Sequence, residues 1–405
     1  MTRQYQIVIA GGGAAGIAVA ASLKQRHSAL RIALVEPNQT HVYQPGQTLV
    51  GRGVMTLKQL KRPTASLLPR GVDWIQQSVA AFEPEQRQVR LDNDEVLEYE
   101  QLVVALGLEL NIDAIDGLSE TLGKNGVTSN YVTELADYTW QQVQALPSGK
   151  ALFTQPPMPI KCAGAPQKAM YLSCDFWKQQ GRLKDIQVEF HNSGAAMFGV
   201  ADFVPVLESY VRGYGAVPVF GSTLVRVDGP NHKAWFAQAD GTELETSFDL
   251  LHVTPPQRAP AVVRNSPLAN EAGWLEVDQY SLQHPRYANV FSLGDVSSAP
   301  NAKTAAAVRK QAPVVALNIL AMRKGQPFAV AYDGYGACPL TVEAGKVVLA
   351  EFGYGGKLLP SFPLNPTRPR RFYWWMKTTL FPWVYWNLML KGREWWLKNQ
   401  RPGQS

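Results

Sequence analysis

Apolar and polar positions follow one another near the N-terminus in blocks that predict a strand, a helix and a second strand. The apolar run QIVIA, residues 6–10, is short enough for a strand and leads directly into GGGAAG, residues 11–16. An alanine-rich stretch up to residue 25 predicts a helix, and RIALVEP, residues 31–37, predicts the next strand. This order of elements indicates an α/β fold.

The turn between the first strand and the helix has the pattern G-x-G-x-x-G. Such glycines permit a tight turn, close approach of the backbone to a pyrophosphate, and close packing of helix on strand. The free N–H groups and the dipole of the helix N-terminus favour the bound anion. An acidic residue at the end of the second strand is placed to bind a ribose hydroxyl. The residues expected to bind a dinucleotide here are Gly11, Gly13, Ala14, Ala15, Gly16 and Glu36.

Two later segments indicate which dinucleotide is bound. YEQLVVALGLEL, residues 99–110, and NVFSLGDVSSAP, residues 289–300, both read as a strand followed by a glycine turn. They are similar to the segments with which flavoproteins of the two-dinucleotide-binding-domain superfamily contact FAD a second and third time. In that superfamily the aspartate of the last segment binds the ribityl chain. FAD is therefore the expected cofactor, with further contacts from Gly107, Gly294 and Asp295.

A second strand-then-helix pattern at residues 185–200 lacks the glycine fingerprint. Gly194 and Gly199 are present, but their spacing does not let the backbone approach a second pyrophosphate. We expect a second Rossmann-like domain without a nicotinamide site, so that a small molecule would deliver electrons directly to the flavin. His191, near the end of this strand, is interpreted as a hydrogen-bonded turn histidine rather than a catalytic base.

Composition narrows the class of protein. A chain of 405 residues predicts two or three domains, and 46% hydrophobic with 18% charged residues is typical of a folded soluble protein. Three cysteines exclude a disulfide-stapled secreted scaffold and favour a reducing compartment. The first strand begins too early for a targeting segment, and no run of about 18 apolar residues predicts a transmembrane helix. No metal site is expected.

The three cysteines differ in their surroundings. Cys174 lies in a helical pattern and is interpreted as a buried packing residue. Cys162 precedes a helix expected to begin near Pro166, and that helix N-terminus together with Lys161 would stabilise a thiolate. Cys338 lies far away in another loop rich in glycine and proline. On this pattern alone a redox pair and two unrelated loop thiols both remain open.

Four segments together resemble the sulfide:quinone oxidoreductases, in the branch that includes the mitochondrial enzymes. The resemblance runs over the whole chain and implies that Cys162 and Cys338 are the redox-active pair. Many bacterial members carry a third cysteine where this chain has Ser129, and its absence favours a two-cysteine mechanism. The segments that carry the resemblance are VYQPGQTLVG (42–51), PIKCAGAPQK (159–168), GDVSSAPNAKTAAAV (294–308) and YDGYGACPL (332–340).

The resemblance also implies a reaction. Hydrosulfide would attack the Cys162–Cys338 disulfide, or a form bridged by an extra sulfur, and leave a persulfide on Cys338. The outer sulfur would pass to glutathione, sulfite or sulfide, while the electrons would pass through FAD to ubiquinone or another membrane quinone. Lys303 is expected near FAD by the same resemblance, and the alternative is that it is an exposed lysine at the start of a helix. Further residues expected near FAD by resemblance are Tyr43, Gln44, Pro45, Val79 and Thr304.

The C-terminal residues 368–405 have a distinct composition. Six of the eleven tryptophans and eight Lys or Arg with a single acid fall here, a mixture that suits a helix in a bilayer interface. Pro382 is expected to divide the segment into two short helices. A packed tail or a homo-oligomer contact is the alternative, and binding to nucleic acid is not expected. The positive charge of this segment contributes to the net charge of +6.

These observations predict an α/β protein with two Rossmann-like domains and a membrane-associated C-terminal helical segment. The FAD domain is expected at 1–110 and 285–335, the second domain at 111–284, and the C-terminal region at 336–405. The expected location is the cytoplasmic face of a bacterial inner membrane, as a peripheral monotopic protein. The alternatives are an NADH:quinone oxidoreductase of the same fold and a non-catalytic flavin-containing redox sensor.

Overall fold

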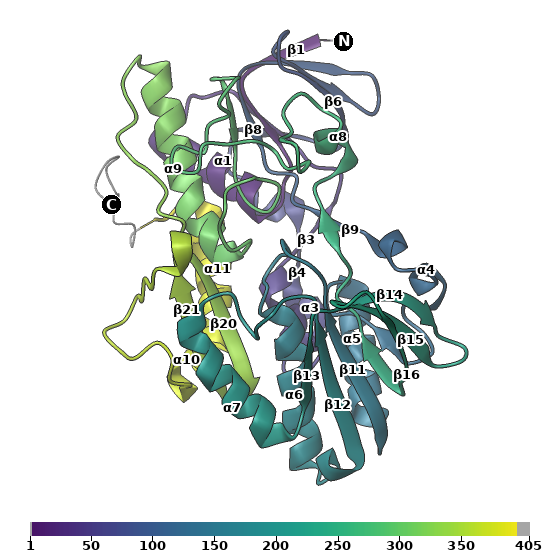
Figure 1. Ribbon diagram of the computed structural model, residues 1–405. Helices are drawn as coiled ribbons and strands as arrows, with labels where there is room; N and C mark the ends of the chain where they lie inside the picture. Colours follow the sequence, from purple (N-terminus) through teal and green to yellow (C-terminus); the bar gives the residue numbers. More distant parts are fainter. Residues whose placement is uncertain (1, 395–405) are drawn as a thin grey trace.

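The computed structural model describes residues 2–394, and a seven-stranded sheet forms the upper part of the molecule (Figure 1). The central strands run parallel, and β6 and β7 form an antiparallel extension. The strand order is β5 (Val72–Ile75), β2 (Ile32–Val35), β1 (Thr2–Ala10), β8 (Val96–Val104), β7 (Gln88–Leu91) and β6 (Val79–Glu83), with β19 (Val290–Ser292) beside β8.

Two helices pack together on this sheet, α1 (Ala14–Arg26) and α9 (Ala305–Arg323) (Figure 1). Small residues, mostly alanine, dominate the buried side of α1, so its axis can lie close to the strands. Lys24 and Arg26 lie in its last turn, where positive charge opposes the helix dipole favourably. The α/β class expected from the sequence is confirmed by this arrangement of helices on a mainly parallel sheet.

A second, fully parallel sheet forms the lower part (Figure 1). Helices α6 (Ala165–Gln179) and α7 (Val204–Tyr214) pack against each other beside it, and an antiparallel three-stranded sheet contacts it through β14. The parallel strands are β10 (Val127–Thr128), β17 (Leu250–His252), β11 (Gly149–Gln155), β12 (Ile186–Asn192) and β13 (Val217–Phe220), and the antiparallel ones are β14 (Ser222–Asp228), β15 (Lys233–Gln238) and β16 (Glu243–Ser247).

A β-hairpin of β20 (Gly336–Glu343) and β21 (Lys346–Phe352) packs its two faces against different parts of the chain. Successive side chains of a strand point to opposite faces. On one face Cys338, Leu340 and Val348 join the hydrophobic cluster that contains the side chains of α6. On the other face Ala337 and Leu349 line the cavity described below.

The chain ends in a helical run that we call the C-terminal arm, residues 371–391. It comprises α10 (Arg371–Trp375), a π turn (Met376–Leu380), α11 (Phe381–Asn387) and a short 3-10 turn (Met389–Lys391). The expected break at Pro382 was wrong, because the backbone stays helical through Leu380 and Phe381. A π turn releases an N–H from the usual ladder, so the missing N–H of Pro382 is tolerated just after it. Trp395 and Trp396 lie outside the described residues.

The remaining elements are short connections. No helix described for residues 2–394 combines the length and apolar character that a bilayer crossing requires. The domain bounds expected from the sequence stay a prediction. The short elements are β3 (Thr40–Val42) with β4 (Lys61–Pro63), β9 (Glu109–Leu110) with β18 (Gln257–Arg258), and α2 (Gln47–Val50), α3 (Leu57–Leu60), α4 (Leu118–Thr121), α5 (Ala136–Ala145) and α8 (Ala261–Arg264).

Candidate active site

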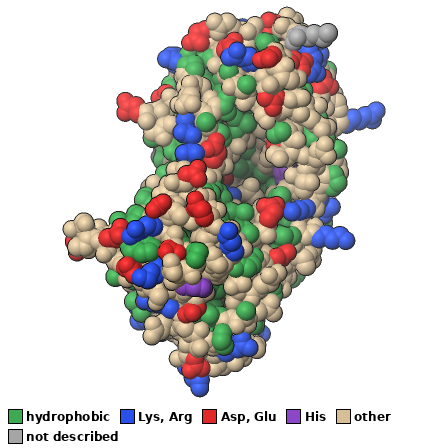
Figure 2. All heavy atoms as spheres, turned by 90° about the vertical axis from the view of Figure 1, so that its right-hand side faces the viewer, with side chains coloured by type: hydrophobic (Ala, Val, Ile, Leu, Met, Phe, Trp, Pro, Cys, Tyr) green, Lys and Arg blue, Asp and Glu red, His purple; other side chains and the backbone are tan. Residues whose placement is uncertain are grey.

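A cavity of about 1070 Å³ begins at the carboxyl ends of the parallel strands in the first sheet. Gly11, Glu36 and Ala105, which directly follow β1, β2 and β8, line it, which is the usual ligand position in such sheets. Figure 2 shows one face of the molecule hollowed at mid-height. The residues proposed from the sequence that line the cavity are Gly11, Gly13, Ala14, Ala15, Glu36, Tyr43, Gln44, Pro45, Val79, Gly107, Cys162, Gly294, Asp295, Lys303 and Thr304.

The glycine turn fits a dinucleotide. A Cβ on Gly11 would lie 2.4 Å from the Ala105 carbonyl oxygen, and one on Gly16 would lie 1.8 Å from the Gly11 carbonyl oxygen. Both positions therefore require glycine for packing, although Gly16 does not itself line the cavity. At Gly13 no atom lies within 4 Å of such a Cβ, and no side chain caps α1. The helix N-terminus thus presents uncapped N–H groups to the cavity, as a pyrophosphate requires.

The acidic and basic residues proposed to contact FAD have partners within the protein. Glu36 accepts hydrogen bonds from the Gly12 N–H at 2.9 Å and the Asn38 N–H at 2.8 Å. The Lys303 ammonium donates to the carbonyls of Asp295 and Ser297 at 2.7 and 2.8 Å. Burial lowers the pKa of Lys303 to about 8. The expected alternative of an exposed lysine was wrong, since Lys303 is buried and braces the loop before α9.

The backbone around Cys162 is held from two sides. The Cys162 N–H donates to the Lys303 carbonyl at 2.9 Å. This hydrogen bond joins the Cys162 loop to the loop before α9. The Tyr131 hydroxyl lies 3.1 and 3.2 Å from the carbonyls of Lys161 and Cys162. Cys162 has φ +49°, in the left-handed region that non-glycine residues seldom adopt. The loop thus fixes the direction of the Cys162 side chain.

The two cysteines expected to form the redox pair lie together. The sulfur atoms of Cys162 and Cys338 are 3.6 Å apart, and both are free thiols. A disulfide bond is about 2.05 Å long, so a small side-chain movement would close it. Cys174 is fully buried on α6, in agreement with its interpretation as a packing residue, and burial raises the pKa of its thiol.

Lys168 is the cation that contacts the pair, and the sequence reasoning missed it. Its ammonium lies 3.0 Å from the Cys162 sulfur and 3.8 Å from the Cys338 sulfur. Lys161, which the sequence had favoured, instead donates to the Gln44 side-chain oxygen at 2.9 Å. The signal was available, because Lys168 lies within the first turn of α6, whose start near Pro166 was correctly predicted.

The pKa values of the two cysteines are shifted in opposite directions. The hydrogen bond from Cys338 is the main cause that lowers the pKa of Cys162 well below its usual range, and the charge of Lys168 adds to it. The same hydrogen bond, with burial, raises the pKa of Cys338. Burial lowers the pKa of Lys168, but its interactions with the two cysteine sulfurs outweigh burial and raise it. These directions favour the thiolate at Cys162 and the thiol at Cys338.

A third lysine near this group comes from the C-terminal arm. Lys377, 3% exposed, donates to the Pro45 carbonyl at 2.7 Å and lines the cavity. Burial, with the neighbouring charge of Lys168, lowers the pKa of Lys377 to about 7. The arm therefore contributes a titratable group to the site as well as packing.

The second sheet ends in a closed turn where a nucleotide fingerprint would lie. The expected helix directly after β12 was wrong, because residues 193–200 form a turn and α7 begins only at Val204. Asn192 closes this turn by accepting from the Gly194 N–H at 2.8 Å and donating to the Ala196 carbonyl at 2.9 Å. Met197 is fully buried in the cluster around α6.

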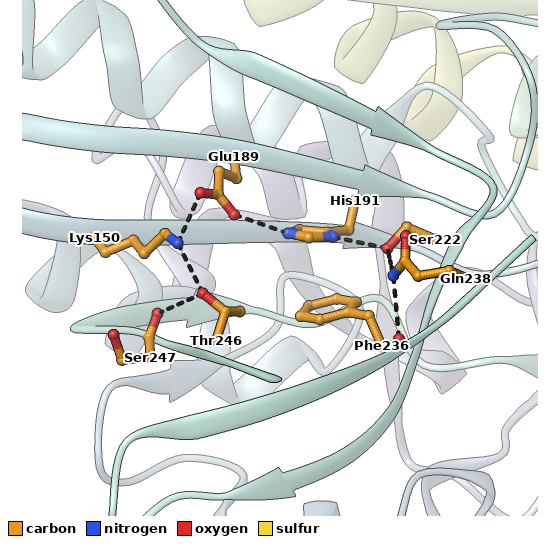
Figure 3. Close-up of polar contacts among 8 residues, drawn as sticks. All are labelled: Lys150, Glu189, His191, Ser222, Phe236, Gln238, Thr246 and Ser247. Carbon is orange, nitrogen blue, oxygen red and sulfur yellow. Dashed lines mark hydrogen bonds and ion pairs between the residues drawn. The ribbon is translucent and has the colours of Figure 1, made fainter. Parts of the chain in front are cut away.

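His191 belongs to a polar cluster (Figure 3). None of the residues in this cluster lines the cavity. The His191 ring nitrogens lie 2.8 Å from the Ser222 hydroxyl and 3.1 Å from the Glu189 carboxylate, which also pairs with Lys150 at 2.7 Å. This order resembles a serine–histidine–acid triad, yet Ser222 and His191 are fully buried and His191 stacks on Phe236. We conclude that the cluster fastens the antiparallel sheet to β11 and β12. Its histidine lies on a strand rather than in the expected turn.

The C-terminal arm divides its aromatic residues between core and surface. Tyr385 and Trp386 are buried in the hydrophobic cluster of the first sheet. There the Tyr385 hydroxyl lies 2.6 Å from the His41 Nε2 atom. Trp375 and Trp383 are 48% and 52% exposed, and Phe372, stacked on Trp375, is 46% exposed. The arm therefore presents large aromatic side chains to solvent while its other side is fixed to the protein.

Comparisons with known proteins agree with this geometry. Residues 5–145 match the family model described as pyridine nucleotide-disulphide oxidoreductase. The chain is 40% identical to the mitochondrial sulfide:quinone oxidoreductase of Dictyostelium discoideum and 38% to that of Mus musculus, over 97% and 96% of this chain and 87% of each relative. Its fold matches that of the Aquifex aeolicus sulfide:quinone oxidoreductase with a TM-score of 0.83, at 20% identity, covering 97% of this chain and 92% of that one. With two relatives this similar over almost its whole length, the chain belongs to the sulfide:quinone oxidoreductase family.

Proposed function

We propose that this chain is an FAD-dependent enzyme that oxidises hydrogen sulfide and passes the electrons to a quinone. The observation that carries the proposal is the Cys162–Lys168–Cys338 group at a cavity whose other end is a dinucleotide cradle. The family relationship supports the same reaction, because the curated relatives are named for sulfide and quinone. A redox sensor would not require the thiolate to face a cofactor cavity.

The cysteine pair supplies the sulfur chemistry. With the pair oxidised to a disulfide, hydrosulfide attacks the Cys338 sulfur, the S–S bond breaks, and Cys338 holds a persulfide while Cys162 leaves as a thiolate. The Lys168 ammonium contacts the Cys162 sulfur and therefore stabilises the thiolate that leaves. A small nucleophile, either glutathione, sulfite or sulfide, then removes the outer sulfur from Cys338.

FAD, when bound, accepts an electron pair from sulfur chemistry and passes it to a quinone. The residues proposed to hold it are the glycine turn at Gly11 and Gly13 for the pyrophosphate, Glu36 for a ribose, and the Gly294–Asp295 turn for the ribityl chain. Gln44, Val79, Gly107, Lys303 and Thr304 complete the proposed contacts, since each lines the cavity.

The quinone is proposed to enter where the C-terminal arm meets the hairpin. We call this part of the cavity the C-terminal chamber. Its side chains are mostly apolar, and a quinone from a bilayer is itself apolar. The residues that define the chamber are Tyr335, Ala337, Pro339, Leu349, Glu351, Ser361, Phe362, Met376, Lys377, Leu380, Phe381 and Val384.

Peripheral attachment to a membrane through the arm belongs to the same proposal. Trp375, Trp383 and Phe372 are exposed next to the chamber, as aromatic residues at a bilayer interface are. Attachment at the cytoplasmic face of a bacterial inner membrane is the location proposed from the sequence. The named relatives are mitochondrial, so the family also serves that organelle.

Replacing both Trp375 and Trp383 by serine is expected to weaken binding to vesicles of phosphatidylcholine and phosphatidylglycerol about tenfold or more, since two large apolar surfaces no longer enter the interface. Vesicle co-sedimentation measures the effect. Tyr280→Ser is the control, because Tyr280 is 48% exposed but lies outside the arm. Equal vesicle binding by the double variant and the wild type would rule out this mode of attachment.

A rapid-mixing experiment tests the reaction. Anaerobic addition of sulfide to the holoenzyme is expected to bleach the flavin within one turnover, and decylubiquinone is expected to restore its colour. NADH is expected to leave the flavin oxidised, because the turn at 193–200 is closed over buried side chains. Bleaching by NADH but not by sulfide would overturn the proposal in favour of an NADH:quinone oxidoreductase.

A further inference from the structure

A buried carboxylate faces the C-terminal chamber from the hairpin. Glu351, on β21, is 4% exposed and lines the cavity. It belongs to the same face of the hairpin as Leu349, opposite the face of Cys338, because side chains alternate along each strand. Acidic side chains are seldom this buried unless they are paired or hydrogen-bonded.

The partners of Glu351 connect it to solvent. The Tyr335 hydroxyl donates to one carboxylate oxygen at 2.6 Å, and the Ser361 hydroxyl donates to the same oxygen at 2.5 Å. The Ser361 N–H donates to the second oxygen at 2.9 Å. Ser361 itself is exposed, whereas Tyr335 is 5% exposed and also lines the chamber. The carboxylate therefore joins a surface hydroxyl to an apolar chamber through hydrogen bonds.

The three hydrogen bonds that the Glu351 carboxylate accepts come from neutral donors, two hydroxyls and one backbone N–H. No salt bridge to Glu351 occurs among the ion pairs found for residues 2–394. This distinguishes it from Glu343 of the same hairpin, which pairs with Lys346 at 2.6 Å.

We propose that Glu351, hydrogen-bonded to Tyr335 and supplied with protons at Ser361, is the proton donor for quinone reduction in the C-terminal chamber. The inference rests on the proposed function for the identity of the chamber's ligand. A quinone becomes a quinol by gaining two electrons and two protons. Reduced FAD, when bound, would supply the two electrons and one of the two protons. The second proton leaves the Glu351 carboxyl, which regains one from solvent through the Ser361 hydroxyl.

The test isolates the oxidative half of the cycle. Photoreduced holoenzyme, prepared without sulfide, is mixed anaerobically with either decylubiquinone or ferricyanide. Ferricyanide accepts single electrons and no proton, so it reports flavin access and folding alone. Glu351→Gln is expected to slow reoxidation by decylubiquinone at least a hundredfold, the lower end of the range of about 10²–10⁴ that a positioned proton donor contributes. Reoxidation by ferricyanide is expected to stay within twofold of the wild type.

Two further variants sharpen the result. Glu351→Asp is expected to recover part of the decylubiquinone rate, and added acetate is expected to accelerate Glu351→Gln but not the wild type, because a small acid can replace the missing carboxyl. Glu343→Gln, on the same hairpin but outside the chamber, is expected to reoxidise at the wild-type rate with both acceptors.

Equal slowing of Glu351→Gln with both acceptors, or no slowing with decylubiquinone, would overturn the proton-donor role. Wild-type enzyme that decylubiquinone cannot reoxidise would overturn it as well. Failure of sulfide oxidation has a different signature: photoreduced enzyme would still transfer electrons to decylubiquinone in a Glu351-dependent manner, while sulfide left the flavin oxidised.

Discussion

Replacing Cys338 by serine is expected to lower sulfide-dependent reduction of decylubiquinone at least a thousandfold, to the background rate. Without its sulfur no disulfide can form with Cys162, so hydrosulfide has no S–S bond to attack and no persulfide carrier. Cys162→Ser is expected to lose activity to the same extent, because it removes the thiolate that leaves. Steady-state quinone reduction with sulfide measures both variants, and anaerobic mixing with sulfide shows whether the flavin still bleaches.

The control for the cysteine variants is Cys174→Ser, since Cys174 is buried on the same helix as Lys168 but takes no part in the pair. It is expected to retain turnover once folded, with some loss of stability from burying a hydroxyl. FAD content and reoxidation of photoreduced enzyme confirm that each variant is intact. Appreciable sulfide turnover in either single variant of the pair would contradict the two-cysteine mechanism.

Replacing Lys168 by methionine is expected to raise the pKa of Cys162, since an opposite charge in contact is lost. The smaller thiolate population is expected to slow flavin reduction by sulfide about tenfold or more at neutral pH. The thiolate population grows as the pH rises, so the variant's rate is expected to recover toward pH 10. The wild-type rate should not need the higher pH, because its thiolate is already formed.

The pH profile of iodoacetamide alkylation of the reduced protein measures the Cys162 pKa directly. Lys178→Met, at the exposed end of the same helix, is the matched control and is expected to leave the profile unchanged. Lys161→Met separates the two lysines considered for this role. A larger shift in Lys161→Met than in Lys168→Met would show that the contact at 3.0 Å is not the one that stabilises the thiolate.

The glycine turn could be read from local sequence because it depends on residues adjacent in the chain. The packing distances at Gly11 and Gly16 show why glycine is needed at these two positions. The start of α6 near Pro166 was predicted for the same reason, because a proline in the first turn is a local signal.

The parts that depend on tertiary packing were not predictable in this way. The contact between Cys162 and Cys338 joins two loops far apart in the chain, and only the family resemblance brought them together. Lys161 precedes the cysteine in sequence, but the first turn of α6 points Lys168 at it. Proline usually breaks a helix, but at Pro382 the helical run continues directly after a π turn. The arm packs there between the hairpin and the hydrophobic cluster of the first sheet.

The two faces of the β20–β21 hairpin have different neighbours. The residues on one face, with Cys338, belong to the sulfur side, and those on the other, with Glu351, belong to the chamber side. A strand is a single backbone thick, so the same hairpin holds the Cys338 sulfur on one face and lines the chamber with the other. Insertion of one residue into such a strand reverses every side chain beyond it, and would carry the sulfur to the chamber side. Evolution of this family toward other acceptors can therefore vary the chamber face alone, while the reactive thiol keeps its own neighbours.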